Sequence, residues 1–505
     1  MKWPLRDTPL RLLSGVLLAG LCLSARAAER PWPFITVKGD RLMEGARTFR
    51  FFGLTAPNLQ QNESQILPDH SNRFPDDYEI RDTLDTLHRL GARATRTFAL
   101  SVASPADKGM PVYIEGRRRY NEEAFRELDR VIALCHEYDV RLIIPVIASQ
   151  SFGGIRGVDE FAALSGKTEQ GAFWTDETVK SDFRALLEYL VNRRNTVDGL
   201  RYKDDPAILA WQLGNEFLSY APDRKLDPGT WTPRITAWSL EMAAYLKRID
   251  PNHLVMEAGG DRKALLASPD IDIMSTHLYE YWNRLFGGPT DLSQAARADW
   301  AACRGKKPLI VDEFGLATVA NVRSLMTTIR ETGISGGLLW SLRSHRRDGG
   351  FYYHNEGGTP INSYHFPGFA TGQSYDEMEL LDLVRAGAYR IQGETVPPLT
   401  APSPAPVLRA LAGGFTWRGS TGAGRYAVER APSPAGPWTV MADNVEDSVV
   451  DDVKGFEASG ASAPLVLWSD ETREPGKTYW YRVRGFNPAG ATGYSNVVSQ
   501  RAEAQ

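Results

Sequence analysis

Short apolar runs alternate with longer stretches of helical periodicity from about residue 51 to residue 390. The runs are rich in Ile, Leu, Val and Trp, and they are bounded as buried strands are. They occupy residues 50–54, 94–100, 141–147, 208–213, 254–257, 271–276, 309–311 and 336–339. Eight parallel strands, each followed by a helix, are what a closed barrel requires. The pattern therefore predicts an α/β fold, a (β/α)8 TIM barrel, over residues 30–395.

The stretches between the runs carry apolar residues at three- and four-residue steps, which is typical of amphipathic helices. One such helix is predicted at residues 78–90. Two others are predicted at residues 121–138, where Asn121 is a good N-cap, and at residues 176–194. The alternation of runs and helices supports the barrel.

The chain changes character after residue 395. Residues 396–406, "VPPLTAPSPAP", form a Pro-rich linker of the stiff, extended kind. Beyond the linker, strand patterns separated by Gly, Pro and Ser replace the helical ones, and Tyr479, Tyr481 and Val483 alternate with polar residues. Residues 407–505 are thus predicted to form a small all-β sandwich. The stretch "GKTYWYRVRGFNPAG" resembles fibronectin type III domains.

The first 27 residues have the composition of a signal peptide. A positive start precedes an apolar stretch and the small-residue pattern Ala-Arg-Ala at residues 25–27. The apolar stretch is shorter than the roughly 20 residues that span a bilayer. Residues 1–27 are therefore expected to direct the protein to secretion or to the periplasm, with no membrane span elsewhere.

Charge narrows the classes of partner. The formal net charge is -4 and the isoelectric point is near 6.1. This balance offers no basic surface for nucleic acid or for an anionic membrane. A neutral partner fits it best, and nothing in the pattern indicates an oligomeric state.

Polar and aromatic residues stand at the ends of the predicted strands. The set comprises Arg96, Asn215, Glu216, His277, Tyr279, Glu313 and Trp340. In a TIM barrel the carboxyl ends of the strands meet at one mouth, where active sites are built. These residues are consequently expected to converge, although they are far apart in sequence.

Two glutamates at such a mouth suit glycoside hydrolysis. Glu216 ends the apolar stretch "AWQLGNEF" and Glu313 ends "PLIVDEFG". A pair of carboxylates about 5 Å apart cleaves with retention of anomeric configuration, and a wider pair that holds a water cleaves with inversion. The sequence does not give the distance.

The motifs "WQLGNEF" and "VDEFG" resemble those of glycoside hydrolase family 5, in the retaining clan A. The resemblance implies that Glu216 is the general acid/base and Glu313 the nucleophile. It also implies that Asn215 binds the 2-hydroxyl of the sugar being cleaved. A positive neighbour such as Arg96 is expected to keep Glu313 ionised.

The same resemblance gives roles to the remaining residues at the mouth. Arg96 and Tyr279 would orient Glu313, and His277 would lie beside the glutamate pair. Trp340 would form the aromatic floor beneath the sugar. No cofactor is required, and the His residues lack the close spacing of metal ligands, so no metal site is expected.

Residues 192–216, "NRRNTVDGLRYKDDPAILAWQLGNE", look most like endo-β-1,4-mannanases. The predicted function is hydrolysis of internal β-1,4-mannosidic linkages in mannan-type polysaccharides. Alternatives within the class are a hydrolase of another β-linked glycan, such as cellulose or xyloglucan, and an exo-acting β-mannosidase. From a different class, the chain could be a catalytically inactive carbohydrate-binding protein.

Overall fold

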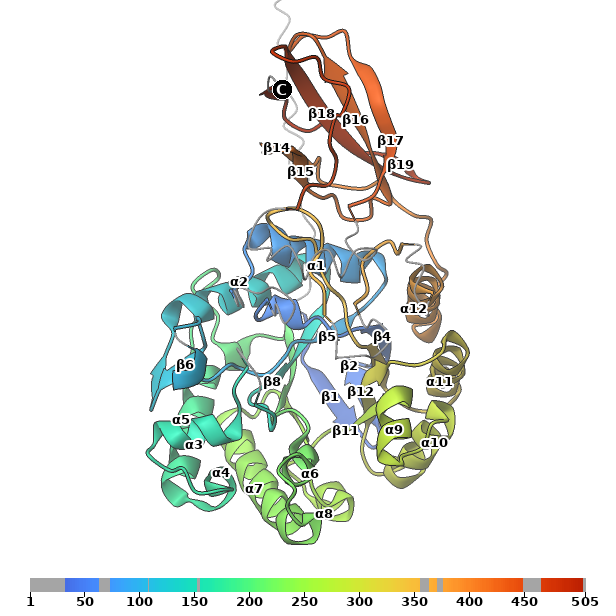
Figure 1. The fold of residues 1–505 in the computed structure, drawn as a ribbon. Helices are drawn as coiled ribbons and strands as arrows, with labels where there is room; N and C mark the ends of the chain where they lie inside the picture. Colours follow the sequence, from blue (N-terminus) through green and yellow to red (C-terminus); the bar gives the residue numbers. More distant parts are fainter. Residues whose placement is uncertain are drawn as a thin grey trace, which may run out of the picture. The chain divides into compact units, whose positions relative to one another are not determined.

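Two four-stranded parallel sheets form the centre of the molecule in the computed structural model (Figure 1). One sheet has the strand order β10-β9-β8-β5 and the other the order β11-β12-β13-β4. The structure describes residues 32–62, 73–107, 109–151, 155–354, 363–369, 376–447 and 465–502. The strands are β4 (Phe51–Leu54), β5 (Ala94–Arg96), β8 (Arg141–Pro145), β9 (Ile208–Gln212), β10 (Leu254–Met256), β11 (Met274–Tyr279), β12 (Leu309–Gly315) and β13 (Gly336–Leu339).

Backbone contacts join the two sheets at both seams. At one seam Ala56 N donates to Arg96 O at 2.9 Å. At the other, Glu257 N donates to Ile273 O at 3.1 Å, and Met256 forms a parallel bridge with Ile273. The eight parallel strands thus close into the predicted barrel.

Apolar side chains fill the barrel and its closed end. Residues such as Ile143, Leu209 and Ile310 belong to one buried cluster inside it. Three antiparallel strands precede the barrel, namely β1 (Ile35–Lys38), β2 (Arg41–Glu44) and β3 (Arg47–Thr48). Ile35 of β1, Leu42 of β2 and Phe49 contribute to the same cluster. Because the strands are buried on both faces, they read as apolar runs rather than as an alternating pattern.

Helices lie outside the strands (Figure 1). The longer ones are α1 (Asp77–Arg89), α2 (Glu122–Tyr138), α5 (Glu177–Asn192), α7 (Pro228–Ile249), α10 (Leu292–Cys303), α11 (Val319–Glu331) and α12 (Glu377–Ile391). Asp76, Asn121 and Asp176 cap the first three with their side chains, as expected of such residues at an N-terminus. The three helices predicted from the sequence are therefore confirmed to within two residues at each end.

Antiparallel strands follow residue 406. They are β14 (Val407–Leu411), β15 (Gly414–Arg418), β16 (Arg425–Ala431), β17 (Thr439–Val445), β18 (Thr478–Asn487), β19 (Gly490–Ala491) and β20 (Val498–Arg501). Trp417, Tyr426 and Tyr481 are part of a core of their own. We call residues 407–502 the C-terminal β region. Its antiparallel strands agree with the all-β character expected of this region.

Several strand bounds depart from the predicted ones. β5 ends at Arg96 rather than at residue 100, and β8 ends at Pro145 rather than at residue 147. β11 begins and ends three residues later than expected, and β12 runs on to Gly315, so that Glu313 lies inside it. Among the described residues no helix is long and apolar enough to cross a bilayer. The predicted signal peptide falls outside the described residues.

Candidate active site

Glu313 lies near the carboxyl end of β12 and is the most firmly held acid of the mouth. Its side chain is 5% exposed. Arg96 Nη1 donates to Glu313 Oε1 at 2.6 Å, and the hydroxyl of Tyr279 donates to Glu313 Oε2. His277 Nδ1 lies 3.3 Å from the same Oε2. All three neighbours favour a carboxylate of fixed orientation.

Glu216 follows β9 and has more freedom. Its side chain is 32% exposed, and its backbone is left-handed, with φ 48° and ψ 49°. Non-glycine residues in this conformation are uncommon and are enriched at functional sites. His277 Nδ1 lies 2.7 Å from Glu216 Oε1, and Gln150 Nε2 donates to Glu216 Oε2.

The two glutamates face one another across His277. One ligand-type atom from each of Glu216, His277 and Glu313 lies within 4.8 Å of the other two. A separation of no more than 4.8 Å between these carboxylate oxygens is smaller than the roughly 6.5–9.5 Å found in inverting enzymes. It matches the short spacing of about 5 Å that is found in retaining glycosidases.

Arg96 connects the acids to the strands around them. It is completely buried, and it donates to Gln212 Oε1 at 2.7 Å, to Asn215 Oδ1 at 2.7 Å and to Glu313. Asn215 Nδ2 in turn donates to Gln150 Oε1 at 3.2 Å. One guanidinium thus fixes three side chains at the ends of two strands, β9 and β12, which is the kind of rigid support that an active site requires.

A cleft of about 710 Å³ opens over the pair. Both glutamates line it, together with Trp340, His354, Trp282 and Phe286. Trp340 packs on Phe98, with ring centroids 5.8 Å apart, and faces His354 at 5.9 Å. The cleft is large enough for sugar units, and its aromatic walls suit their apolar faces.

The pKa of Glu313 differs from the expectation that Arg96 alone keeps this carboxylate ionised. Burial raises the pKa of Glu313 to about 7, although His277 and Arg96 act to lower it. The carboxylates of Glu313 and Asp312 raise the pKa of His277 well above its usual value, against the effect of burial. The raised pKa favours the imidazolium form of His277, whose Nδ1 donates to Glu216 and whose Nε2 donates to Asp312. Arg96 by itself does not hold Glu313 at an ordinary acidity.

The structure places all seven predicted residues around this cleft. Six form one hydrogen-bonded group, and Trp340 lines the wall. The structure adds four residues to this site that were not predicted from the sequence: Gln150, Asp312, Trp282 and Phe286. The aromatic pair in "YEYWNRLF" just after β11 was a usable signal. Gln150 and Asp312 had none, because their roles depend on contacts between distant strands.

Glu216, His277 and Glu313 also have a spacing that a metal ion could use. The guanidinium of Arg96 and the imidazolium of His277 would repel a cation there. Both oxygens of Glu313 already accept hydrogen bonds from Arg96 and Tyr279. The donor set fits proton transfer and nucleophilic attack better than metal binding.

Comparison with known proteins agrees with this geometry. Residues 33–332 match the family model described as GH family 5 beta-mannosidase-like. Mannan endo-1,4-beta-mannosidase 7 of Oryza sativa subsp. japonica is 31% identical over 366 residues, which cover 63% of this chain and 90% of that protein. The match to another rice relative covers 58% of that relative's length.

Solved structures agree on the fold. The endo-1,4-beta-mannanase from Rhizomucor miehei superposes with a TM-score of 0.56 at 21% identity, over 72% of this chain and all of that one. Together with the match over residues 33–332, the parallel barrel and the glutamate pair at its mouth identify the chain as a glycoside hydrolase that belongs to family 5, in its beta-mannosidase-like group.

Proposed function

We propose that the protein is a retaining glycoside hydrolase that cleaves internal β-1,4-mannosidic linkages. The observation that carries this proposal is the pair of carboxylates, Glu216 and Glu313, with oxygens within 4.8 Å at the barrel mouth. Their surroundings differ in the way that two distinct roles require, since one acid is held rigidly and the other is partly open to the cleft.

In the first step Glu313 is the nucleophile. An oxygen of its carboxylate forms a bond to the anomeric carbon while the bond to the leaving oxygen breaks. Glu216 gives its proton to that leaving oxygen, and His277 and Gln150 hold its carboxyl group in place. Arg96 and Tyr279 keep Glu313 aimed at the anomeric carbon.

In the second step a water molecule releases the sugar. Glu216, now a carboxylate, takes a proton from that water, and the water oxygen displaces Glu313 from the anomeric carbon. Two inversions give net retention. The amide of Asn215 points into the cleft beside Glu216 and is proposed to bind the 2-hydroxyl of the reacting sugar.

The names of the relatives support mannan as the substrate of this protein. Several of them are named as mannan endo-1,4-beta-mannosidases, at identities near 30%. Exo-acting β-mannosidase activity is the second candidate, because the family description itself is beta-mannosidase-like. Endo or exo action depends on the loops at residues 58–77 and 344–369, and parts of both lie outside the described residues.

Two further features of the proposal rest on sequence. The signal-like residues 1–27 support export, where a polymeric glycan would be met. The linker at residues 396–406, and the resemblance of residues 407–505 to fibronectin type III domains, support a second folded part after the barrel.

Variants of the two glutamates test the proposal. Glu313→Gln keeps the shape of the side chain but removes the nucleophile, and kcat on mannan should fall by at least about a thousandfold. In Glu216→Ala the kcat on mannan should fall by about 10²–10⁴-fold. The first step on activated aryl mannosides should be retained, because their leaving groups need no proton. Added azide should then give a glycosyl azide of retained configuration.

Glu241→Gln is a matched control, because that carboxylate pairs with Lys180 and Arg184 between α5 and α7. The kcat of this variant on mannan should equal that of the wild type.

Product analysis of the wild-type reaction should show short mannooligosaccharides early. Release of mannose alone would favour exo action, and hydrolysis confined to cellulose or xyloglucan would change the substrate. A product of inverted anomeric configuration would contradict the retaining mechanism.

A further inference from the structure

The chain that follows β13 leaves the cleft and returns to it. Trp340 stands at the cleft, residues 345–349 lie against the C-terminal β region, and His354 is back at the cleft facing Trp340. We call residues 341–354 the return loop. The return loop thus begins directly after one cleft residue, Trp340, and ends at another, His354, while its middle contacts the C-terminal β region.

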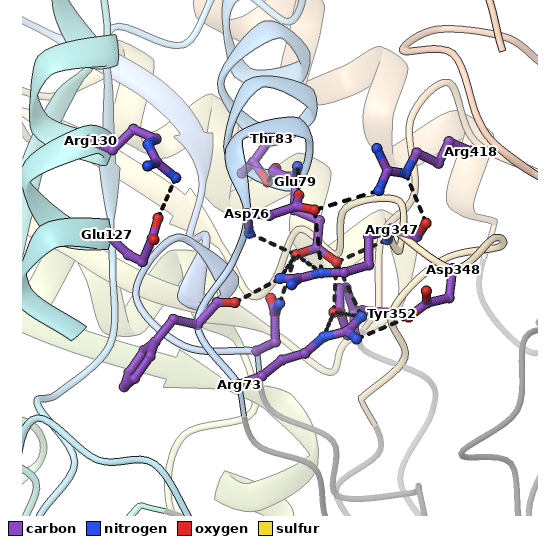
Figure 2. Close-up of polar contacts among 12 residues, drawn as sticks. Arg73, Asp76, Glu79, Thr83, Glu127, Arg130, Arg347, Asp348, Tyr352 and Arg418 are labelled. Carbon is purple, nitrogen blue, oxygen red and sulfur yellow. Dashed lines mark hydrogen bonds and ion pairs between the residues drawn. The ribbon is translucent and has the colours of Figure 1, made fainter. Parts of the chain in front are cut away.

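A buried carboxylate ties the middle of the return loop to α1. Figure 2 shows Glu79 at the centre of this network, and its side chain is fully buried. Glu79 accepts from Arg347 N at 2.9 Å, from Arg347 Nη2 at 2.6 Å and from Tyr352 OH at 2.9 Å. Arg73 reaches both Glu79 and Tyr352. This side of the loop is held by the barrel itself.

The C-terminal β region holds the other side. Arg418 Nε donates to Arg347 O at 3.0 Å, and Arg409 Nη2 donates to the same oxygen. Thr416 Oγ1 donates to Asp348 O at 3.4 Å. Because these bonds reach backbone carbonyls of the loop, they fix the path of the chain and not only its side chains.

A buried charge cluster lies beside these bonds. His345 contacts Asp82 of α1 at 2.9 Å and Asp447 of the C-terminal β region at 3.2 Å. Thr421 Oγ1 donates to Asp82 at 2.7 Å. The side chain of His345 is 1% exposed. Loss of one partner from such a cluster is costly, because it leaves a buried charge uncompensated.

The two surfaces meet without space for one more carbon atom. A Cβ on Gly349 of the return loop would lie 2.0 Å from Thr416 Oγ1. A Cβ on Gly419 of the C-terminal β region would lie 2.3 Å from the ring of His345 and 2.6 Å from Asp447 Oδ2. Tyr78 OH also donates to Gly419 O at 3.0 Å.

We propose that the C-terminal β region is a positioning element of the active site, which sets the return loop so that Trp340 and His354 stand correctly in the cleft. The proposal rests on the function proposed above in one respect, namely that this cleft is where hydrolysis occurs. Thr416, Arg418 and Gly419 are then positioning residues, since they act on the sugar only through the loop.

Gly419→Ala in the full chain tests the proposal, because its methyl group would push directly on His345. The matched control is Gly493→Ala, whose Cβ would lie 3.7 Å from Ala405 Cβ, an ordinary contact. Activity on short mannooligosaccharides is measured well below the unfolding temperature of every variant. Gly419→Ala should lower kcat/KM by about ten- to a hundredfold, as small misplacements of a site do, and Gly493→Ala should not.

Two readouts separate positioning from mere stability. The pH profile of Gly419→Ala should keep the limbs of the wild type, because Glu216 and Glu313 are not on the return loop. Amide hydrogen exchange in residues 341–354 should be faster in Gly419→Ala than in Gly493→Ala. If Gly419→Ala does not fold, Thr421→Val, which removes one hydrogen bond to Asp82 and adds no bulk, should show the same effects in weaker form.

A folded Gly419→Ala variant with a lower Tm, unchanged kcat/KM and unchanged exchange would overturn the proposal and leave the C-terminal β region with a structural role only. Inactivity of the wild type on every mannan would contradict the proposed function instead. In that case the exchange measurement still decides whether the C-terminal β region orders the return loop.

Discussion

Tyr279 shows how single side chains set the chemistry of the mouth. Its hydroxyl donates to Glu313, and this hydrogen bond favours the ionised carboxylate and lowers the pKa of Glu313, while burial raises it. The protonated acid is not a nucleophile. The rate at low pH should therefore follow the titration of Glu313, with kcat/KM falling as the pH decreases through its pKa.

Tyr279→Phe should shift the acid limb of kcat/KM upward by about one to two pH units. The reason is that the lost hydrogen bond to a charged group is of the order of 1.5–3 kcal/mol. The measurement is the pH profile of kcat/KM on a soluble mannooligosaccharide. Tyr281→Phe serves as control, because Tyr281 packs beside the cleft cluster. An acid limb that stays in place, or moves to lower pH, would show that Glu313 does not control it.

At the scale of elements, the helix α9 (Glu280–Phe286) extends the cleft outward. Trp282 and Phe286 stack with ring centroids 6.0 Å apart and an interplanar angle of 19°. Phe286 is 81% exposed, which is unusual for a large apolar side chain beside a site. We interpret the two rings as a surface for a sugar unit away from the scissile bond.

Phe286→Ala should raise KM on polymeric mannan about fivefold, corresponding to about 1 kcal/mol of lost ring contact, with kcat unchanged. Aryl mannosides, which occupy only the centre of the cleft, should be hydrolysed at wild-type rates. Leu285→Ala is the matched control, because Leu285 is also exposed but does not line the cleft. Equal effects of the two substitutions on KM would mean that the ring has no specific contact with the substrate.

Sequence pattern was sufficient for the elements that bury apolar faces in a regular way. The eight strands and the helices α1, α2 and α5 appear close to where periodicity predicts them, and Asn121 caps α2 as predicted. β11 was predicted to begin three residues early, because the apolar residues Ile271 and Ile273 have the pattern of a strand. Only one isolated bridge and two backbone hydrogen bonds, all made by Ile273, join these two residues to the neighbouring strand. Local pattern does not record which strand lies alongside.

The same limit applies to the site. Glu216 and Glu313 end apolar runs and are therefore conspicuous in the sequence. The roles of Gln150 and Asp312 emerge only when β8 lies beside β9 and β11 lies beside β12, since each residue contacts a residue far away along the chain. The contacts of the C-terminal β region with the return loop likewise join residues far apart in sequence and leave no local pattern.

At the scale of the whole molecule, the cluster of Asp82, His345 and Asp447 couples stability to pH. Burial lowers the pKa of His345, but Asp82 and Asp447 outweigh it and raise this pKa to about 10. A folded-state pKa above the unfolded value of about 6.5 contributes stability that is fully present below pH 6.5 and is lost as the pH rises through about 10. Tyr78 and Tyr426, whose own pKa values Asp82 and Asp447 raise, are the other titratable groups that face the cluster.

Asp447→Asn should keep the shape of the cluster and remove one of the two charges that hold the proton on His345. We expect the variant to have a lower Tm than the wild type near neutral pH, and the difference to shrink as the pH approaches about 10. Thermal unfolding followed across this range gives the comparison. Asp443→Asn, at an exposed position of β17, is the control. A difference in Tm that does not vary with pH would show that His345 is not the group being titrated.

The passage of one loop from the cleft to the C-terminal β region and back limits how freely this protein can exchange parts in evolution or in the laboratory. A module joined only by a linker can be replaced without consequence for its neighbour. Here a graft that put a foreign module after residue 396 would also have to reproduce the surface of Thr416, Arg418 and Gly419 on which the return loop rests. Recombination near the linker should therefore yield soluble barrels with poor turnover more often than working chimaeras, and residues 345–349 would have to be transferred together with the module that they contact.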